Sequence, residues 1–321
     1  MKKVLFGLSV LVLASCGGKS TQSGQDAADS TTSSLSGQIQ LSGAFALYPM
    51  AVKWAEEFKA IHPNVKIDIS GGGAGKGITD ALAGVVDIGM VSRDVYPEEV
   101  EKGAWAIPTV KDAVVPTYNV NNPEAESIKK IGLKREVAIK LWSEKIKTWG
   151  EILGTSSKVP VHVFTRSDAC GAAETFAAWL GYKQENLKAT AVFGDPGVAS
   201  AVQKDRVSVG YNNIAYAYDQ HTKKPFEGLA VVPLDVNENG KIDPEEDFYG
   251  NVSDLIEAIN DGRYPSPPAR YLNLVTKGKP TKPEVVEFLR FILSEGQQYA
   301  GETGYIPLPA DRAQEELDKL N

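Results

Sequence analysis

Four short segments combine glycine, hydroxyl-bearing and arginine residues where the sequence predicts that a strand turns into a helix. They span residues 42–49, 70–77, 87–94 and 166–174. Each can present backbone N–H groups at the start of a helix, which favours an anion. Arg93 and Arg166 can add charge-assisted hydrogen bonds to such an anion. Taken singly, a glycine-rich turn is more often an ordinary turn and an arginine a surface residue. Only the four segments together indicate an oxyanion site.

The glycine-rich segment at residues 70–77 lacks the spacing of a nucleotide-binding loop. The pattern G-x-x-x-x-G-K-[ST] fails because residue 70 is serine and residue 77 is glycine. The pattern G-x-G-x-x-G does not occur in it either. Nucleotide binding is therefore not indicated.

A second motif, at residues 235–246, predicts a calcium site. The run fits the EF-hand loop pattern D-x-[DN]-x-[DN]-G-x₅-E over its full length. In that pattern oxygen atoms at alternating positions surround Ca²⁺, position 7 offers its backbone carbonyl, and glycine at position 6 permits the sharp turn. The alternative is an Asn- and Gly-rich surface turn. We expect a structural calcium ion held by Asp235, Asn237, Asn239, Lys241, Asp243 and Glu246.

The elements that must position the four segments alternate between strand and helix. Strands are predicted at 37–41, 65–69 and 87–91, and helices at 51–61 and 77–84. Such a succession predicts an α/β fold with parallel strands covered by helices. Ligands of open α/β folds bind in the crevice where the strand-to-helix turns meet.

The N-terminus resembles the signal peptide of a bacterial lipoprotein. Lys2 and Lys3 precede an apolar run at 4–12 that is too short to span a bilayer. We expect a signal peptide at 1–15, a lipid on Cys16 and a flexible polar tether at 16–36. An ordinary secretory peptide or a buried helix is the alternative. The lipid would anchor an exported body to a membrane, facing the periplasm or the cell exterior.

Composition limits the remaining functions. The net charge is −7, or −9 without Lys2 and Lys3, and the sequence pI is about 5.2. Such an acidic chain is not expected to bind nucleic acid. The three histidines are scattered without zinc-ligand spacing.

In this order the segments resemble the phosphate-binding component of bacterial phosphate ABC transporters, over about residues 38–309. The matching pieces are Pro49 to Trp54, the glycine-rich loop, Asp87-Ile88-Gly89, 115–119, 122–123, 146–149, Arg166-Ser167-Asp168, 174–176, 210–211 and 304–308. The resemblance implies a two-lobed periplasmic-binding-protein fold, type II-like, with a mainly parallel sheet in each lobe. It implies lobe 1 at 37–115 and 275–321, lobe 2 at 116–274, and chain crossings near 114–119 and 270–275.

The resemblance also implies what the protein binds. A monomeric, non-enzymatic protein would close around phosphate or a related oxyanion and deliver it to the permease subunits of an ABC transporter. The implied ligand-binding residues are Ala44, Phe45, Ala46, Leu47, Ala74, Ser92, Arg93, Arg166, Asp168, Cys170, Gly171 and Ala172.

Several of these positions lack the hydroxyl that is usual in the family. The first loop reads Ala-Phe-Ala-Leu, Ala74 stands where serine is common, and Cys170 and Ala172 replace serine and threonine. Each lost hydrogen bond to a charged ligand costs about 1.5–3 kcal/mol if nothing replaces it. A different, partly apolar ligand, or a surface scaffold or adhesin with a degraded pocket, is therefore the alternative. Cys170 is interpreted as a small substitute for serine rather than a catalytic thiol.

Overall fold

The structure is a computed structural model, and it describes residues 35–321. The predicted signal peptide, Cys16 and all but the last two residues of the predicted tether lie outside the described residues. Across residues 35–321, no helix is both long and apolar enough to cross a membrane.

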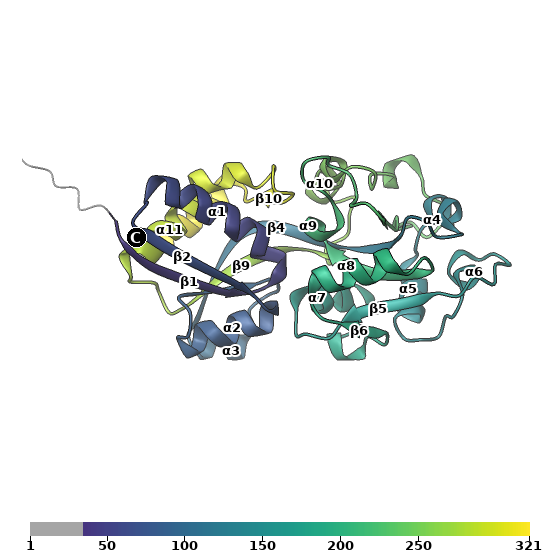
Figure 1. Ribbon diagram of the computed structural model, residues 1–321, viewed down its shortest axis with the longest axis horizontal. Helices are drawn as coiled ribbons and strands as arrows, with labels where there is room; N and C mark the ends of the chain where they lie inside the picture. The colour runs from purple at the N-terminus through teal and green to yellow at the C-terminus, as the bar shows by residue number, and fades with distance from the viewer. Residues whose placement is uncertain (1–34) are drawn as a thin grey trace, which may run out of the picture. The chain divides into compact units, whose positions relative to one another are not determined.

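Strands and helices alternate through most of the chain (Figure 1). The strands are β1 (Gly37–Gly43), β2 (Val65–Gly71), β3 (Ile88–Val91), β4 (Ala104–Asn119), β5 (His162–Arg166), β6 (Thr190–Val192), β7 (Ser208–Asn213), β8 (Leu229–Val231), β9 (Ala269–Lys277) and β10 (Ile306–Pro307). The α-helices are α1 (Tyr48–Ile61), α2 (Gly73–Ala83), α3 (Pro97–Glu101), α4 (Ala125–Ile131), α5 (Arg135–Leu141), α6 (Trp149–Leu153), α7 (Gly171–Leu180), α8 (Gly194–Lys204), α9 (Ile214–Ala217), α10 (Val252–Asn260), α11 (Pro283–Leu293) and α12 (Ala310–Leu320). Short 3₁₀ turns are η1 (Phe45–Leu47), η2 (Gln184–Asn186), η3 (Pro244–Glu246) and η4 (Glu295–Tyr299).

The strands join in the order β2-β1-β3-β9-β4-β7-β5-β6. The pairs within β2-β1-β3 and within β7-β5-β6 are parallel, as the sequence predicts. The two long strands β4 and β9 run antiparallel to each other and to their outer neighbours. They lie between the two groups of parallel strands in Figure 1. The fold is therefore α/β with a mixed sheet and helices on its faces.

Two large hydrophobic cores flank this central pair of strands. One core draws on residues between 39 and 110 and between 272 and 320, and the other on residues between 113 and 269 plus Ile306. We call the parts of the chain that hold these cores lobe 1 and lobe 2. The division expected from sequence, after residues 115 and 274, falls inside β4 and β9.

Helix α1 shows how the sequence builds lobe 1. Pro49 lies in its first turn, where a missing N–H costs nothing, and its buried face carries Met50, Trp54 and Phe58 at helical spacing. Helix α2 begins at Gly73, four residues earlier than the sequence predicts. The glycine-rich segment is thus partly the first turn of a helix rather than a free loop.

Candidate functional site

The four predicted segments meet where lobe 1 faces lobe 2. The N–H of Gly75 on α2 donates to the carbonyl oxygen of Ala169 at 3.1 Å. A Cβ atom added to Gly171 would lie 2.0 Å from the carbonyl oxygen of Ser92. The hydroxyl of Tyr216 donates to the carbonyl oxygen of Phe45 at 3.1 Å. The backbones of the two lobes are therefore in close contact at this place.

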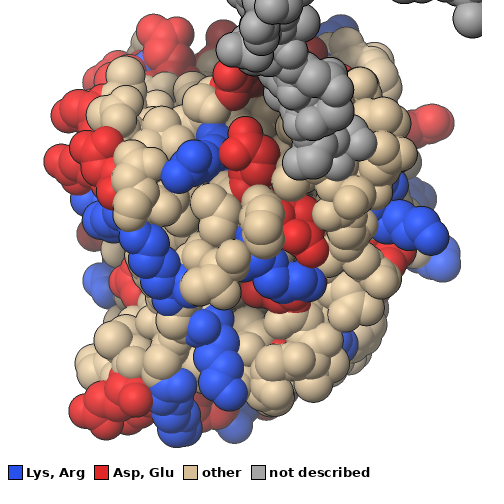
Figure 2. Space-filling model, turned by 90° about the vertical axis from the view of Figure 1, so that its left-hand side faces the viewer, with Lys and Arg blue, Asp and Glu red and all other residues tan. Residues whose placement is uncertain are grey.

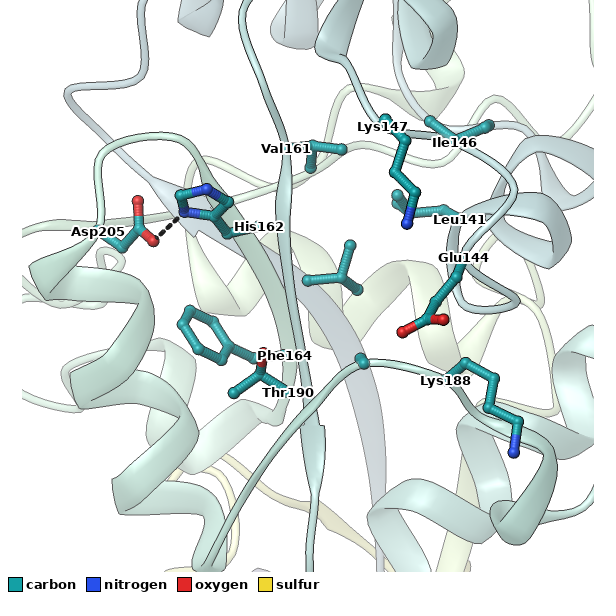
Figure 3. Close-up of a pocket in the computed structure, with 12 residues that line it drawn as sticks. Leu141, Glu144, Ile146, Lys147, Val161, His162, Phe164, Lys188, Thr190 and Asp205 are labelled. Carbon is teal, nitrogen blue, oxygen red and sulfur yellow. Dashed lines mark hydrogen bonds and ion pairs between the residues drawn. The ribbon is translucent and has the colours of Figure 1, made fainter.

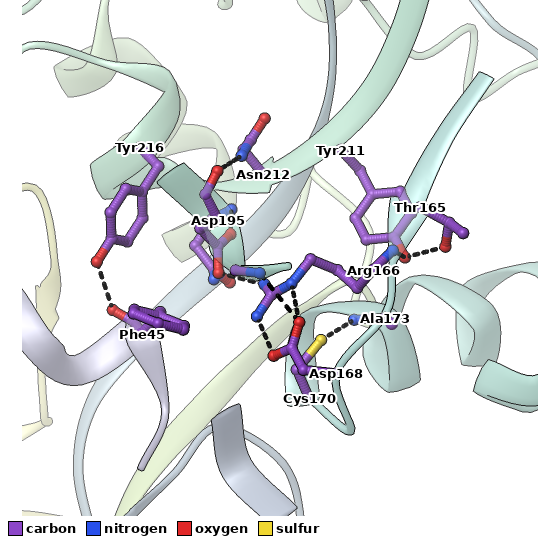
Figure 4. A network of polar contacts seen from close by, with 12 residues as sticks. Phe45, Thr165, Arg166, Asp168, Cys170, Ala173, Asp195, Tyr211, Asn212 and Tyr216 are labelled. Carbon is purple, nitrogen blue, oxygen red and sulfur yellow. Dashed lines mark hydrogen bonds and ion pairs between the residues drawn. The ribbon is translucent and has the colours of Figure 1, made fainter. Parts of the chain in front are cut away.

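Arg166 stands at the centre of the site and is 4% exposed. Its Nε donates to Asp168 at 2.8 Å and its Nη2 to the other oxygen of that carboxylate at 2.5 Å. Its Nη1 pairs with Asp195, so the guanidinium lies between two carboxylates (Figure 4). Burial opposes ionisation of Asp168, but the bonds from Arg166 outweigh it and lower the pKa of that carboxyl.

Arg93 is also held by two carboxylates. Its Nη1 and Nη2 bind Glu99 at 2.8 and 2.7 Å, and its Nε lies 3.1 Å from Glu174 in lobe 2. Its guanidinium also lies 4.1 Å above the ring centre of Tyr96. The two arginines predicted from sequence thus face four carboxylates, and an anion must compete with these.

The first loop contributes apolar surface to the site. Ala44, Ala46 and Leu47 are buried. The ring of Phe45 has its centre 5.8 Å from the guanidinium carbon of Arg166 and meets Phe193 of lobe 2 edge to face. The loop therefore offers an aromatic ring where the resemblance noted from sequence implies hydroxyl groups.

The fourth segment opens α7 with Cys170 as its N-cap residue. Its Sγ accepts a hydrogen bond from the N–H of Ala173 at 3.4 Å, which is the role an N-cap serine plays. The thiol is 3% exposed, and burial raises its pKa to about 12, against the opposing influence of Arg166. A thiol of this kind is not prepared for nucleophilic chemistry.

The remaining predicted residues of the site, Ala74, Ser92, Gly171 and Ala172, are buried beside Cys170.

A large cavity adjoins these residues. It measures about 1350 Å³ and is lined from both lobes, by Arg93 and Tyr96 on one side and by Arg166 and Glu174 on the other, and also by Arg270 on β9. Small-molecule sites are typically about 300–1,000 Å³, so an inorganic anion would occupy only part of this space. A smaller cavity of about 320 Å³ lies in lobe 2 around His162 and Lys188 (Figure 3). None of the predicted site residues lines it.

Sequence reasoning missed three charged residues of this region. Asp195, in the first turn of α8, is 1% exposed and holds both Arg166 and the N–H of Asn213. Its segment Gly-Asp-Pro-Gly follows a strand and opens a helix, the same signal that marked the other loops. Asp112 and Arg270 face each other across β4 and β9, and no local motif marks either.

The loop at residues 235–246 folds around its own polar groups. Asp235 accepts hydrogen bonds from the N–H groups of Asn239 and Gly240, at 3.0 and 2.7 Å. Glu246 accepts from three further backbone N–H groups, and Asp243 pairs with the ammonium of Lys241. In residues 35–321, no group of three or more His, Cys, Asp or Glu side chains is arranged to hold a metal ion.

The charged side chains on the surface are of both signs. On the face that Figure 2 shows, Lys and Arg side chains stand among Asp and Glu rather than forming one basic surface. The net charge of the whole chain is −7.

This fold and this site define a solute-binding protein. The sequence model of the PBP superfamily domain matches residues 28–296, and the chain belongs to that family. The proteins to which it is similar are named as binding proteins, and the chain is a binding protein rather than an enzyme.

Curated relatives span nearly the whole chain. The phosphate-binding protein PstS of Methanocaldococcus jannaschii is 28% identical and is matched over 100% of this chain and 96% of its own length. The PstS protein of Bacillus subtilis is also 28% identical, over 95% of this chain and 92% of its length.

A solved structure supports the same assignment. It is a protein from Clostridium perfringens that is named for phosphate ABC transport and was solved with phosphate bound. It superimposes with a TM-score of 0.70 and 26% identity, covering 85% of this chain and 100% of that one.

Proposed function

We propose that this protein captures phosphate, or a closely related oxyanion, between its lobes and delivers it to the permease of an ABC transporter. The observation that carries the proposal is the convergence of Arg166 and the N-terminus of α7 on one buried place where the lobes meet. Helix N-termini and guanidinium groups both favour phosphate. The names of the full-length relatives support the same ligand.

Calorimetry on the purified chain tests this proposal. Phosphate is expected to bind with a stoichiometry of one, and sulfate and molybdate serve as competing oxyanions. No heat with any of the three would remove the proposed function.

A larger anion is the second candidate ligand. The cavity beside Arg166 has room for an organic group, and Phe45 and the wall residues Leu187 and Ala189 offer apolar contacts. A phosphate monoester that binds more tightly than inorganic phosphate in the same calorimeter would favour this candidate.

We propose further that the chain is exported and anchored through a lipid on Cys16. The order of a basic start, a short apolar run and small residues before the cysteine supports this. The tether at 16–36 would let the body work at a distance from the bilayer, near its permease. Mass spectrometry of the membrane fraction tests the lipid: a Cys16→Ser variant is expected to lose it.

We also propose a structural calcium ion in the loop at residues 235–246. Two observations support it: the full match to the twelve-residue pattern, and the burial of two of its carboxylates, Asp235 at 1% and Glu246 at 6% exposed. The ligands would be the oxygens of the six residues predicted from sequence. Calcium would offset the crowding of negative charge that Lys241 now relieves in part.

A further inference from the structure

Arg270 reaches the proposed site from the strand that connects the lobes. It lies on β9, its side chain is 8% exposed, and it lines the cavity between the lobes. Its Nη2 donates to Oδ1 of Asn213. The backbone N–H of Asn213 in turn donates to Asp195, the carboxylate that holds Arg166. Arg270 therefore belongs to the same polar network as the predicted anion site.

Two of the nitrogen donors of the Arg270 guanidinium have no hydrogen-bond acceptor in the described part of the chain. Its Nε and Nη1 are buried and have no hydrogen-bond partner within residues 35–321. The nearest carboxylate is that of Asp112, whose Oδ2 lies 3.7 Å from Nη2, beyond hydrogen-bond distance. Buried donors without acceptors are rare in native proteins, since each has lost its hydrogen bonds to water. Both carboxylate oxygens of Asp112 are likewise buried without a hydrogen-bond partner within residues 35–321, and of these two residues it is Arg270 that lines the cavity.

Charge distinguishes Arg270 from the other two arginines of the cavity. Arg93 faces Glu99 and Glu174, and Arg166 faces Asp168 and Asp195. Each of those guanidinium groups is outnumbered by carboxylates.

Arg270 faces one carboxyl group, that of Asp112. Burial raises the pKa of Asp112 to about 7, with Arg270 opposing the shift. Arg270 keeps more uncompensated positive charge than Arg93 or Arg166.

We propose that Arg270 binds the anion directly and supplies donors that the hydroxyl-poor loops lack. This rests on the proposed function, because it names a residue of that same site. An oxyanion entering from the cavity accepts hydrogen bonds from the free N–H groups of Arg270 and balances its charge. The second guanidinium takes the place of the missing serine and threonine side chains.

Calorimetric titration of the full chain with inorganic phosphate at pH 8 tests this inference. Arg270→Gln is expected to weaken phosphate binding by about 10- to 150-fold, the range for one hydrogen bond to a charged group. Arg270→Lys, which keeps the charge, is expected to lose less. Arg263→Gln is the matched control, since Arg263 is a half-exposed arginine paired with Asp261. The phosphate affinity of this variant should not change.

Asp112→Asn separates a binding role from a structural one. If Arg270 binds the anion, removing its carboxylate neighbour makes phosphate its main partner, and phosphate binds more tightly. If Arg270 only pairs with Asp112, the variant leaves a buried charge alone, and phosphate binds equally well or less tightly. This variant also decides the question should Arg270→Gln fail to fold, as judged by its melting temperature without ligand.

The outcomes distinguish a failure of the Arg270 proposal from a failure of the proposed phosphate-binding function. If the unaltered chain binds no phosphate, the proposed function fails, and the role of Arg270 with it. If the unaltered chain binds phosphate and folded Arg270→Gln binds it equally well, only the role of Arg270 is overturned.

Discussion

The carboxylate of Glu174 lies 3.1 Å from Nε of Arg93 and accepts a 2.7 Å hydrogen bond from the hydroxyl of Tyr96. Glu174 belongs to α7 of lobe 2, whereas Arg93 and Tyr96 belong to lobe 1. The contact therefore holds the lobes together beside the site without being a contact to the anion. Removing it should favour separation of the lobes.

Glu174→Gln is accordingly expected to shift the ligand-free protein towards separated lobes by at most about five-fold, because one partly exposed ion pair contributes about 1 kcal/mol or less. Small-angle scattering without ligand should show a larger radius of gyration than for the unaltered chain. Glu227→Gln, at an exposed position of lobe 2, is the control. An unchanged radius of gyration would mean that the Glu174 contact does not hold the lobes together.

Gly171→Ala tests the close approach of the two lobes. The added Cβ would lie 2.0 Å from the carbonyl oxygen and 2.4 Å from Oγ of Ser92. Overpacking of this kind costs about 1–3 kcal/mol, which corresponds to a loss of about 5- to 150-fold in phosphate affinity if only the closed form binds.

The melting temperature of the Gly171→Ala variant without ligand should change little, because the lobes can separate to relieve the clash. Gly250→Ala is the control, since nothing lies within 4 Å of its added Cβ. If Gly171→Ala bound phosphate as tightly as the unaltered chain, the lobes would not need this close contact in order to bind phosphate.

Asp112 should make stability depend on pH. Burial raises its folded-state pKa from the ordinary 3.8 to about 7, with Arg270 as the main opposing charge. Between these values the folded protein binds more protons than the unfolded chain, so this group's contribution to stability falls as pH rises, by up to about 1.4 kcal/mol per pH unit.

Urea unfolding at pH 4.5, 6 and 7.5 checks this. The stability of Asp112→Asn relative to the unaltered chain should rise across the series, because asparagine does not titrate. A constant difference would mean that Asp112 ionises normally in the folded state.

Cys170 should behave as a buried cap rather than a reactive thiol. In a Cys16→Ser background, its thiol should resist a disulfide reagent at pH 8 and react after unfolding in urea, because burial raises its pKa to about 12. Cys170→Ser should preserve stability, since serine is a preferred N-cap residue, whereas Cys170→Ala should lose about 1 kcal/mol. Rapid reaction of the folded protein would contradict this.

Calcium should raise the melting temperature of the full chain, and excess chelator should remove the increase. Glu246→Gln is expected to abolish the response to calcium, whatever the stability of the variant without calcium. The substitution removes a carboxylate ligand of the proposed calcium ion. Magnesium provides the control ion. A melting curve that calcium and chelator leave unchanged would remove the calcium proposal.

Local patterns in the sequence were sufficient to predict the elements that carry the site. The strand and helix ranges near residues 37–91 follow from apolar periodicity, and the structure confirms those elements with shifted ends. Helix α2 begins earlier than expected, at Gly73 inside the glycine-rich segment, where glycine accommodates a φ of +82°.

The partners of the charged residues could not be predicted in this way. Tyr96 and Glu174 are 78 residues apart in sequence, and Arg270 meets Asp112 only because β4 and β9 pair. Such contacts depend on the topology of the sheet, which local periodicity does not encode. The sequence accordingly predicts Arg93 and Arg166 as hydrogen-bond donors to an anion, but it does not reveal the four carboxylates that pair with them.

A crystal structure of the full chain grown with phosphate tests the central claim most directly. It should show one tetrahedral anion between the lobes, within hydrogen-bond distance of Arg166, the first N–H groups of α7, and Nε or Nη1 of Arg270. Lobes closed as described here around ordered water alone, with phosphate absent or bound elsewhere, would contradict the account.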